Sequence, residues 1–180
     1  MKKIAVLFAT GFEEIEALTP VDVLRRAGFQ CDMIGLTDFY VQGSHGIKVE
    51  VDSIFNNIEL SDYDLIVLSG GMPGATNLRE DNNLIKAIQK AVAQNRLVAA
   101  ICAAPIVLEK AGLLENRQYT CYPGQEKELT TGCHLEENVV VDGQVITSRG
   151  AGTSLEFSYK LVEMLGGDAS TLAKSMVFSN

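Results

Sequence analysis

Three short, uninterrupted apolar runs constrain the fold of this chain more than any other feature. Runs of this length are typical of strands that are buried on both faces, as they are in parallel sheets. Between and after them, apolar residues recur at helical spacing, so strands and helices alternate along the chain. This alternation predicts a doubly wound α/β sandwich, with right-handed crossovers that place helices on both faces of the sheet. The three runs are Ile4–Phe8, Leu65–Leu68 and Leu97–Ile101.

The remaining elements are predicted from periodicity and turn residues. Apolar residues between Ile15 and Leu24 indicate a helix that Gly28 closes, and a strand over 30–35 completes an opening βαβ unit. The pair Asp142-Gly143 predicts a hairpin between strands at 139–141 and 144–147. We also expect a small hairpin formed by 41–42 and 47–51, and helices over 82–94, 103–110, 153–165 and 169–177.

Length and composition fit a single globular domain covering residues 1–180. The net charge of −8 and the pI near 4.8 disfavour binding to nucleic acids and to anionic membranes. The longest apolar stretch, 97–108, is too short to span a bilayer, and acidic residues interrupt the N-terminal apolar run before it can form a signal peptide. We therefore expect a cytoplasmic protein.

Cysteine and histidine spacing argues against a disulfide framework or a structural metal site. No Cys-x-x-Cys pair is present, and the histidines stand at no zinc-ligand spacing from the cysteines. Free thiols in a reducing compartment are mostly inert core residues, and lone surface histidines seldom act as bases, so only context can single one out. The residues concerned are Cys31, Cys102, Cys121, Cys133, His45 and His134.

Cys102 has such a context because it follows the apolar run 97–101 directly. Pro105 is tolerated only in the first turn of a helix, so Cys102 is expected on a sharp strand-to-helix turn. There the helix dipole would favour the thiolate and lower the thiol pKa, as in a nucleophile or a redox sensor. Ligands bind beyond the carboxyl ends of parallel strands, so Cys102 is expected to share one crevice with loops 9–11 and 69–74.

Two neighbouring features fit that crevice, although each also has an ordinary explanation. The backbone N–H groups of Gly70 and Gly71, with that of Ala103, are placed to stabilise an oxyanion, whereas a plain tight turn explains the glycines equally well. Glu16 lies deeper in its helix than Glu13 and Glu14, so it is a candidate for a buried, protonated carboxyl that hydrogen-bonds the cysteine. The stretch 148–153 resembles a phosphate cradle but lacks a P-loop ending, and we interpret it as a helix start.

Four segments together resemble the ThiJ/PfpI family, especially its parkinsonism-associated, DJ-1-like deglycase branch. The similarity runs from Ile4 to about Val177. It implies a flavodoxin-like, three-layer sandwich with a mostly parallel sheet, as in class I glutamine amidotransferases, and a homodimer. The segments are Gly11–Glu16, Pro20–Gly28, Ala99–Ala103 and Thr147–Gly150.

The resemblance also implies roles for individual residues. Cys102 would be an easily oxidised nucleophile, Glu16 its hydrogen-bonding partner, and the N–H groups of Gly71 and Ala103 would face the substrate oxygen. Family members are described as cofactor-independent glyoxalases, as deglycases acting on methylglyoxal or glyoxal adducts, and as redox-responsive chaperones. We expect no cofactor and no metal, and we assign Gly70, Tyr122 and His45 to the substrate pocket.

The chain departs from the family pattern at three positions. Tyr122-Pro123 stands where the animal branch has His-Pro, and a tyrosine cannot replace that histidine as a base at neutral pH. Ser69 replaces a proline before the glycine pair, a change we expect to be minor. Ala103 stands where the peptidase-like branch has histidine, which disfavours peptidase activity, and nothing here supports the thiamine-biosynthesis name of some relatives.

Two main functional hypotheses follow, and both depend on Cys102. In the first, the protein is an enzyme that adds its thiolate to a 2-oxoaldehyde such as methylglyoxal and releases a hydroxy acid. In the second, it is a redox sensor or chaperone whose cysteine is oxidised to sulfinic acid without turnover. A scaffold role is a third alternative. The small aldehyde is the expected partner of the enzyme.

Overall fold

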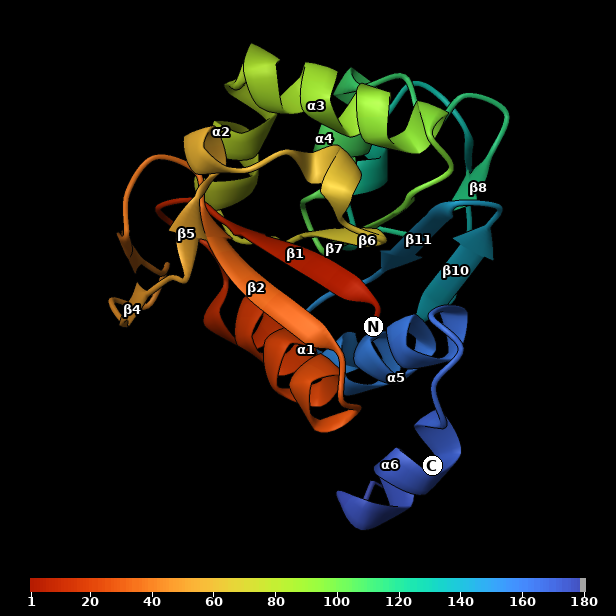
Figure 1. The fold of residues 1–180 in the computed structure, drawn as a ribbon. Coiled ribbons are helices and arrows are strands. Elements are labelled where there is room, and N and C mark those ends of the chain that lie inside the picture. The colour runs from red at the N-terminus through yellow and green to blue at the C-terminus, as the bar shows by residue number, and fades with distance from the viewer. Residues whose placement is uncertain (179–180) are drawn as a thin grey trace.

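A seven-stranded sheet forms the centre of the computed structural model, which describes residues 1–178 (Figure 1). Its strands are β1 (Lys3–Phe8), β2 (Gln30–Gly35), β5 (Ser53–Ile54), β6 (Leu65–Leu68), β7 (Leu97–Ile101), β10 (Val139–Asp142) and β11 (Val145–Ser148). Their order across the sheet is β10-β11-β7-β6-β1-β2-β5. Only β10 and β11 pair antiparallel in this sheet; every other neighbouring pair is parallel. The mostly parallel sheet expected from the sequence is confirmed.

Helices cover both faces of the sheet and complete a three-layer sandwich (Figure 1). They are α1 (Glu14–Arg26), α2 (Gly74–Glu80), α3 (Asn82–Ala93), α4 (Pro105–Lys110), α5 (Ser154–Met164) and α6 (Ala169–Ser175). Helices α2, α3 and α4 lie on one face, and α1 and α5 lie side by side on the other. The flavodoxin-like fold is therefore confirmed. Helix α6 packs against α5 at the C-terminal end.

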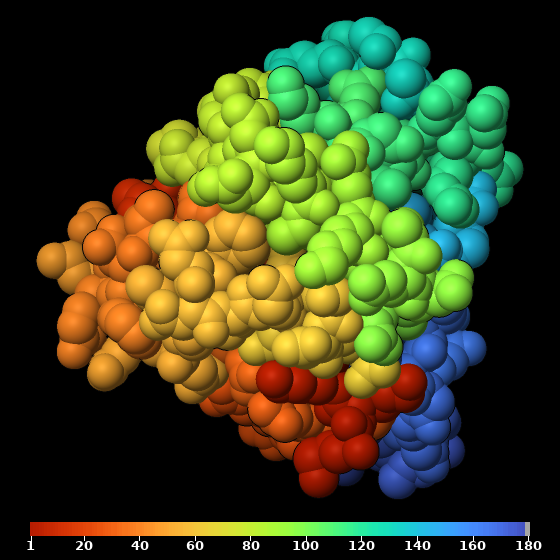
Figure 2. All heavy atoms as spheres, turned by 45° about the horizontal axis from the view of Figure 1, so that its top comes forward, coloured from red at the N-terminus to blue at the C-terminus, as the bar shows by residue number. Residues whose placement is uncertain are grey.

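The period of two in β1 explains how one strand serves two cores. Ala5 and Leu7 are fully buried against the helices α2, α3 and α4, while Ile4, Val6 and Phe8 are fully buried on the α1 and α5 face. Burial on both faces is what an uninterrupted apolar run requires of its surroundings. Figure 2 shows the outer surface of the layer that contains α3. There α3 and the segment 53–62, which lies earlier in the chain, form a continuous face.

Two smaller pairs of strands lie outside the main sheet. The antiparallel hairpin β3 (Tyr40–Gln42) and β4 (Lys48–Glu50) occurs where the sequence predicted it. The parallel pair β8 (Gln118–Tyr119) and β9 (Cys133–His134) was not predicted, because strands of two residues leave no periodic signal.

Three expectations about helices need correction or refinement. Helix α2 was missed because the Gly-Gly-Met-Pro-Gly segment before it was interpreted as a loop only. Helix α4 begins at Pro105 and not at residue 103, so Cys102 and α4 are separated by a short turn. The stretch after β11 is indeed a helix start, with one 3₁₀ turn (Ala151–Thr153) leading into α5. Among residues 1–178, no helix has both the length and the apolar character needed to cross a membrane.

Candidate active site

The loops that follow β1, β6 and β7 meet at the carboxyl edge of the sheet, as expected for ligand sites in parallel sheets. The N–H of Glu13 donates to the carbonyl of Gly70 at 3.0 Å, and the N–H of Gly74 donates to the carbonyl of Gly11 at 3.3 Å. Gly70 in turn lies against Cys102, because a Cβ built on Gly70 would be 2.7 Å from the Cys102 Cβ. The three loops that the sequence predicted to share one crevice therefore lie together in the fold.

Cys102 occupies a strained position at this edge. Its φ is +64°, in the left-handed region that costs a residue with a side chain about 1–2 kcal/mol. Hydrogen bonds of 2.9 Å on both sides hold this conformation, since its N–H donates to the carbonyl of Ser148 and its carbonyl accepts from the N–H of Tyr122. Strain maintained by the surrounding backbone is typical of functional sites.

The electrostatic setting of Cys102 differs from the sequence-based expectation. The pKa of its thiol is raised, first by burial and then by the charge and hydrogen bond of Glu16. The backbone N–H groups of Ala103 and Gly71 face the sulfur and act in the opposite direction. The expected lowering of the thiol pKa by a helix dipole was wrong, because burial and Glu16 outweigh the groups that would lower it. Helix α4 also starts three residues after Cys102 and is only six residues long. Any thiolate here depends on the two N–H groups and on the protonation state of Glu16.

Glu16 is a buried carboxyl whose protonation state affects whether Cys102 can form a thiolate. It is 1% exposed, and burial raises the pKa of its carboxyl to about 7, against the opposing effect of its hydrogen bond with Cys102. The backbone N–H of Gly70 also faces this carboxyl and acts to lower its pKa. One carboxyl oxygen, Oε2, is buried without a hydrogen-bond partner among residues 1–178. A neutral carboxyl tolerates such an environment better than a charged one does.

The glycine pair leaves room for these two functional groups. A Cβ on Gly70 would collide with the Glu16 carboxyl, so only glycine lets the carboxyl and the sulfur approach each other. Gly71 has a φ of +86° and packs directly against the backbone of Gly11 and Phe12. The N–H of Gly71 points to the sulfur, as does that of Ala103, so the two donors expected for an oxyanion lie together.

Tyr122 borders the same crevice and is 54% exposed. A Cβ built on Gly150 would lie 3.5 Å from the ring of Tyr122. The same Cβ would lie 3.9 Å from a carboxyl oxygen of Glu16. Gly150 thus forms part of the wall around Glu16, although the sequence indicated only a helix start there. The place of Gly150 follows from the strand pairing. Strand β11 pairs with β7 so that Ser148 lies beside Ile101, the residue before Cys102, and Gly150 follows two residues later.

His45, which was assigned to the substrate pocket, makes its polar contacts with the start of α1 and with Ser44. Its imidazole is 68% exposed and lies 2.9 Å from Glu14 Oε2, and its partners among the described residues are Glu13, Glu14 and Ser44. Burial alone would raise the pKa of Glu14, but hydrogen bonds from the ring of His45 and from backbone N–H groups lower it to about 2. This ion pair fixes the β3–β4 hairpin to the start of α1. None of the hydrogen bonds or ion pairs that His45 forms among residues 1–178 involves Cys102.

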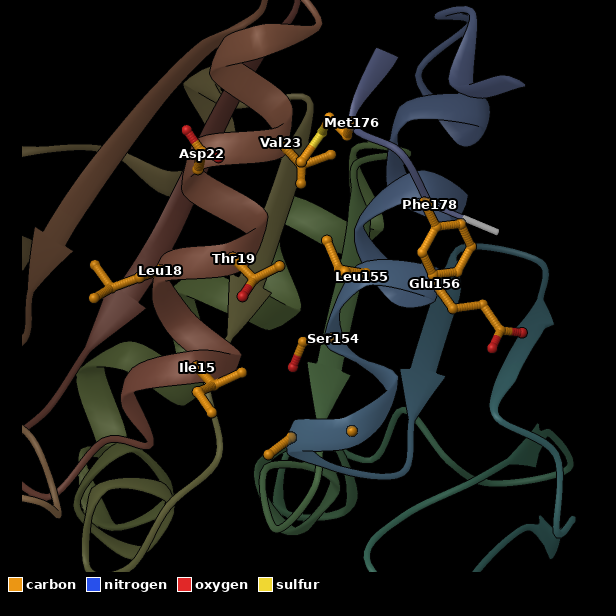
Figure 3. Close-up of a pocket in the computed structure, with 12 residues that line it drawn as sticks. Ile15, Leu18, Thr19, Asp22, Val23, Ser154, Leu155, Glu156, Met176 and Phe178 are labelled. Atoms are coloured by element: carbon orange, nitrogen blue, oxygen red, sulfur yellow. The ribbon is translucent and has the colours of Figure 1, made fainter. Parts of the chain in front are cut away.

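A second hollow lies away from Cys102, between α1 and α5. It has a volume of about 490 Å³, and Figure 3 shows Thr19 and Val23 of α1 on one side and Leu155 of α5 on the other. Ile15, at its edge, leaves 54% of its surface exposed. This groove contains an exposed apolar strip but none of the polar groups of the crevice.

Comparison with known proteins identifies relatives of this architecture. The chain is 40% identical to Protein DJ-1 homolog B of Arabidopsis thaliana over 92% of its length, but it spans only 38% of that protein. It is 35% identical to "Glutathione-independent glyoxalase DJR-1.2" of Caenorhabditis elegans, covering 88% of this chain and 86% of the relative. The solved structure of oxidized DJ-1 from Toxoplasma gondii superposes with a TM-score of 0.95 at 34% identity, over the whole of both chains.

A family model also covers the chain almost completely. The model described as DJ-1/PfpI family matches residues 2–164, a range that includes Glu16, Cys102 and Gly150. The sheet order, the strained cysteine and the sequence match together show that the chain belongs to the DJ-1/PfpI family.

Proposed function

We propose that the protein is a cysteine-dependent glyoxalase or deglycase that converts 2-oxoaldehydes such as methylglyoxal, free or as adducts, into hydroxy acids. The observation that carries this proposal is the pairing of Cys102 with a buried Glu16 whose pKa is raised to about 7. A carboxyl with a pKa near neutrality can both donate and accept a proton at working pH. The glyoxalase name of the nematode relative supports the same reaction class.

The first step is addition of the sulfur to the aldehyde carbon. The pair holds one proton, and moving it from the thiol to the carboxylate gives a thiolate beside a neutral acid without a net change in charge. The thiolate forms a C–S bond, and the former carbonyl oxygen takes the proton from Glu16 to give a hemithioacetal. Backbone N–H groups of Gly71 and Ala103 lie where negative charge develops on this oxygen.

The second step moves a hydrogen between the two carbons of the substrate. Glu16, now a carboxylate, removes the proton from C1 and returns it to C2. The hydroxyl proton on the C1 oxygen moves to the C2 oxygen, so that C1 becomes a thioester and C2 an alcohol. Water then cleaves the thioester, releasing lactate and regenerating the thiol. Methylglyoxal plus water gives lactate, and no external oxidant is consumed. Tyr122 and His45 have no part in these proton transfers, since the first is a weak acid and the second binds Glu14.

Replacing Glu16 by glutamine tests this mechanism. We expect kcat/KM for lactate formation from methylglyoxal to fall about 10²–10⁴-fold, the usual contribution of a positioned acid–base group. In the wild type, kcat/KM should rise as the pH passes through about 7, because the reactive pair then holds one proton instead of two. Glutamine cannot take the thiol proton, so this limb should move to higher pH. The measurement is a pH series of initial rates.

The matched control is Glu80→Gln, which neutralises an exposed carboxyl that pairs with Arg79 far from the crevice. Its rates and pH profile should equal those of the wild type. An unshifted pH limb in Glu16→Gln with unchanged kcat/KM would contradict the role proposed for Glu16.

The redox alternative has one specific observation in its favour. The N–H groups of Gly71 and Ala103 that face the sulfur would equally hold the oxygens of a sulfinate, and one similar solved structure is of an oxidized protein. In this reaction the thiolate reduces two peroxide molecules in turn, each giving one water, and becomes sulfenic and then sulfinic acid. Two measurements on the same preparation separate the functions: lactate formation from methylglyoxal, and intact mass after mild peroxide treatment. Turnover without a mass change favours the enzyme, and a two-oxygen gain at Cys102 without turnover favours the sensor.

We also propose that the chain forms a homodimer through the exposed side of α1. Apolar Ile15 is exposed at the groove beside α5, and Ile47 is exposed on the neighbouring hairpin. We expect Ile15→Glu to raise the dimer dissociation constant at least 10-fold, because a charge would be buried in the contact. Light scattering after size exclusion measures this shift. Val177→Glu, at another exposed apolar residue, should leave it unchanged, and a monomeric wild type would contradict the proposal.

A further inference from the structure

A cluster of three potential metal ligands lies in the segment that leads from β8 to β9. Cys121 follows β8, Glu126 lies in a 3₁₀ turn (Gln125–Glu128), and His134 lies in β9. One ligand atom from each residue lies within 4.8 Å of the other two. The residues are five and eight positions apart in the chain, a spacing typical of no zinc motif, so the sequence predicts no metal site.

The histidine of this cluster has an unusual environment. Nε2 of His134 is buried and lacks a hydrogen-bond partner among residues 1–178. Leaving a buried polar atom unpaired costs about 1–3 kcal/mol, so such atoms usually have a ligand, an ion or a water. The ring is held in place from one side by Tyr119, with ring centroids 5.7 Å apart, and β8 pairs with β9 at these two residues.

The other two side chains are also fixed in position. Cys121 is fully buried, and the backbone N–H of Glu126 faces its sulfur. Glu126 Oε2 accepts the N–H of Gly124 at 2.7 Å, which orients the carboxylate on its short turn. The three groups are therefore presented by backbone segments that hydrogen bonds and strand pairing hold together.

We infer that Cys121, Glu126 and His134 form a binding site for a divalent transition-metal ion of the Zn²⁺ type. Thiolate, imidazole and carboxylate together are a ligand set that zinc favours. Bonds of about 2.3 Å to sulfur and 2.0 Å to nitrogen and oxygen place tetrahedral ligand atoms roughly 3.3–3.5 Å apart, so a closure of at most about 1.5 Å suffices. Binding displaces the thiol proton to solvent and leaves the fourth position for water.

The location of the site favours a structural role, although three protein ligands and one water are the usual set of a catalytic zinc site. Two anionic ligands neutralise the ion, although the charge of Arg149 acts on Cys121 and adds one positive charge nearby. Tyr122 follows Cys121 in the chain and donates its N–H to the carbonyl of Cys102. An ion held by Cys121 would thus fix the segment that carries Tyr122 along the crevice, without touching the reacting atoms.

The test is metal binding by the full chain after dialysis against a chelator. Titration with Zn²⁺ against a colorimetric chelator should give one ion per chain, and Co²⁺ should give the near-ultraviolet charge-transfer absorption of a thiolate ligand. Cys121→Ser and His134→Asn should each weaken binding more than about 100-fold, because groups that merely orient a ligand already contribute 10–100-fold. Glu126→Gln should weaken it as well.

Two cysteine variants serve as controls. Cys133→Ser removes an exposed thiol next to His134, and Cys102→Ala removes the crevice thiol; both should keep the stoichiometry and the Co²⁺ absorption. Zn²⁺ should raise the Tm of the wild type and of both controls but not that of His134→Asn, which decides the question if Cys121→Ser does not fold. A wild type that binds no ion, binding that follows Cys102 or Cys133, or undiminished binding by His134→Asn would overturn the inference.

Discussion

Cys102→Ala should lower kcat/KM for lactate formation from methylglyoxal by about 10⁴-fold or more, because no other group on the described chain can replace the nucleophile. The three remaining cysteines cannot do so: Cys31 and Cys121 are buried, and Cys133 lies on β9, outside the crevice. The same substitution should remove the two-oxygen mass gain after peroxide. Initial rates of lactate formation and intact mass measure both effects on one preparation.

The control for this prediction is Cys133→Ser, which removes the most accessible thiol and should keep full activity. Circular dichroism should show both variants folded, since alanine and serine fit where cysteine does. Residual turnover in Cys102→Ala within a factor of ten of the wild type would show that the reaction does not pass through this sulfur. It would contradict the enzymatic proposal, whereas the redox proposal depends on whether the mass gain disappears in this variant.

Gly71→Ala is expected to destabilise the protein by about 2–5 kcal/mol, the largest single effect on folding predicted here. Two costs add at this position. Its φ of +86° is unfavourable for alanine, and the new Cβ would lie 2.6 Å from the carbonyl oxygen of Gly11 and 2.7 Å from the carbonyl carbon of Phe12. These neighbours are backbone atoms, so they cannot move aside by changing rotamer. Urea unfolding at pH 7 measures the loss.

Gly28→Ala separates the two costs, because Gly28 has a similar φ of +82° but no atom within 4 Å of a built Cβ. We expect a loss of only about 1 kcal/mol there, from the backbone conformation alone. Equal losses of stability at both positions would mean that the loop around Gly71 relaxes. The tight contact between the loops that follow β1 and β6 would then not be needed to position the N–H of Gly71.

The sequence was sufficient to locate the crevice but not to describe its chemistry. Cys102 stood out because a buried strand ends there, and Gly70 and Gly71 because a second strand ends in a glycine pair. The direction of the Cys102 pKa change was wrong, since it depends on burial and on Glu16, 86 positions earlier in the chain. His45 was assigned to the substrate pocket, and the structure shows that its ion-pair partners are Glu13 and Glu14.

What the sequence alone determined is the layered α/β fold, because apolar period and turn residues act between near neighbours and each buried run has to be covered on both faces. Tertiary structure alone decided which polar groups meet: Glu16 with Cys102, Glu14 with His45, and Cys121 with Glu126 and His134. Proton sharing and metal ligation depend on separations of a few ångströms, and such distances are set by strand order and loop packing, which leave no periodic trace in the chain.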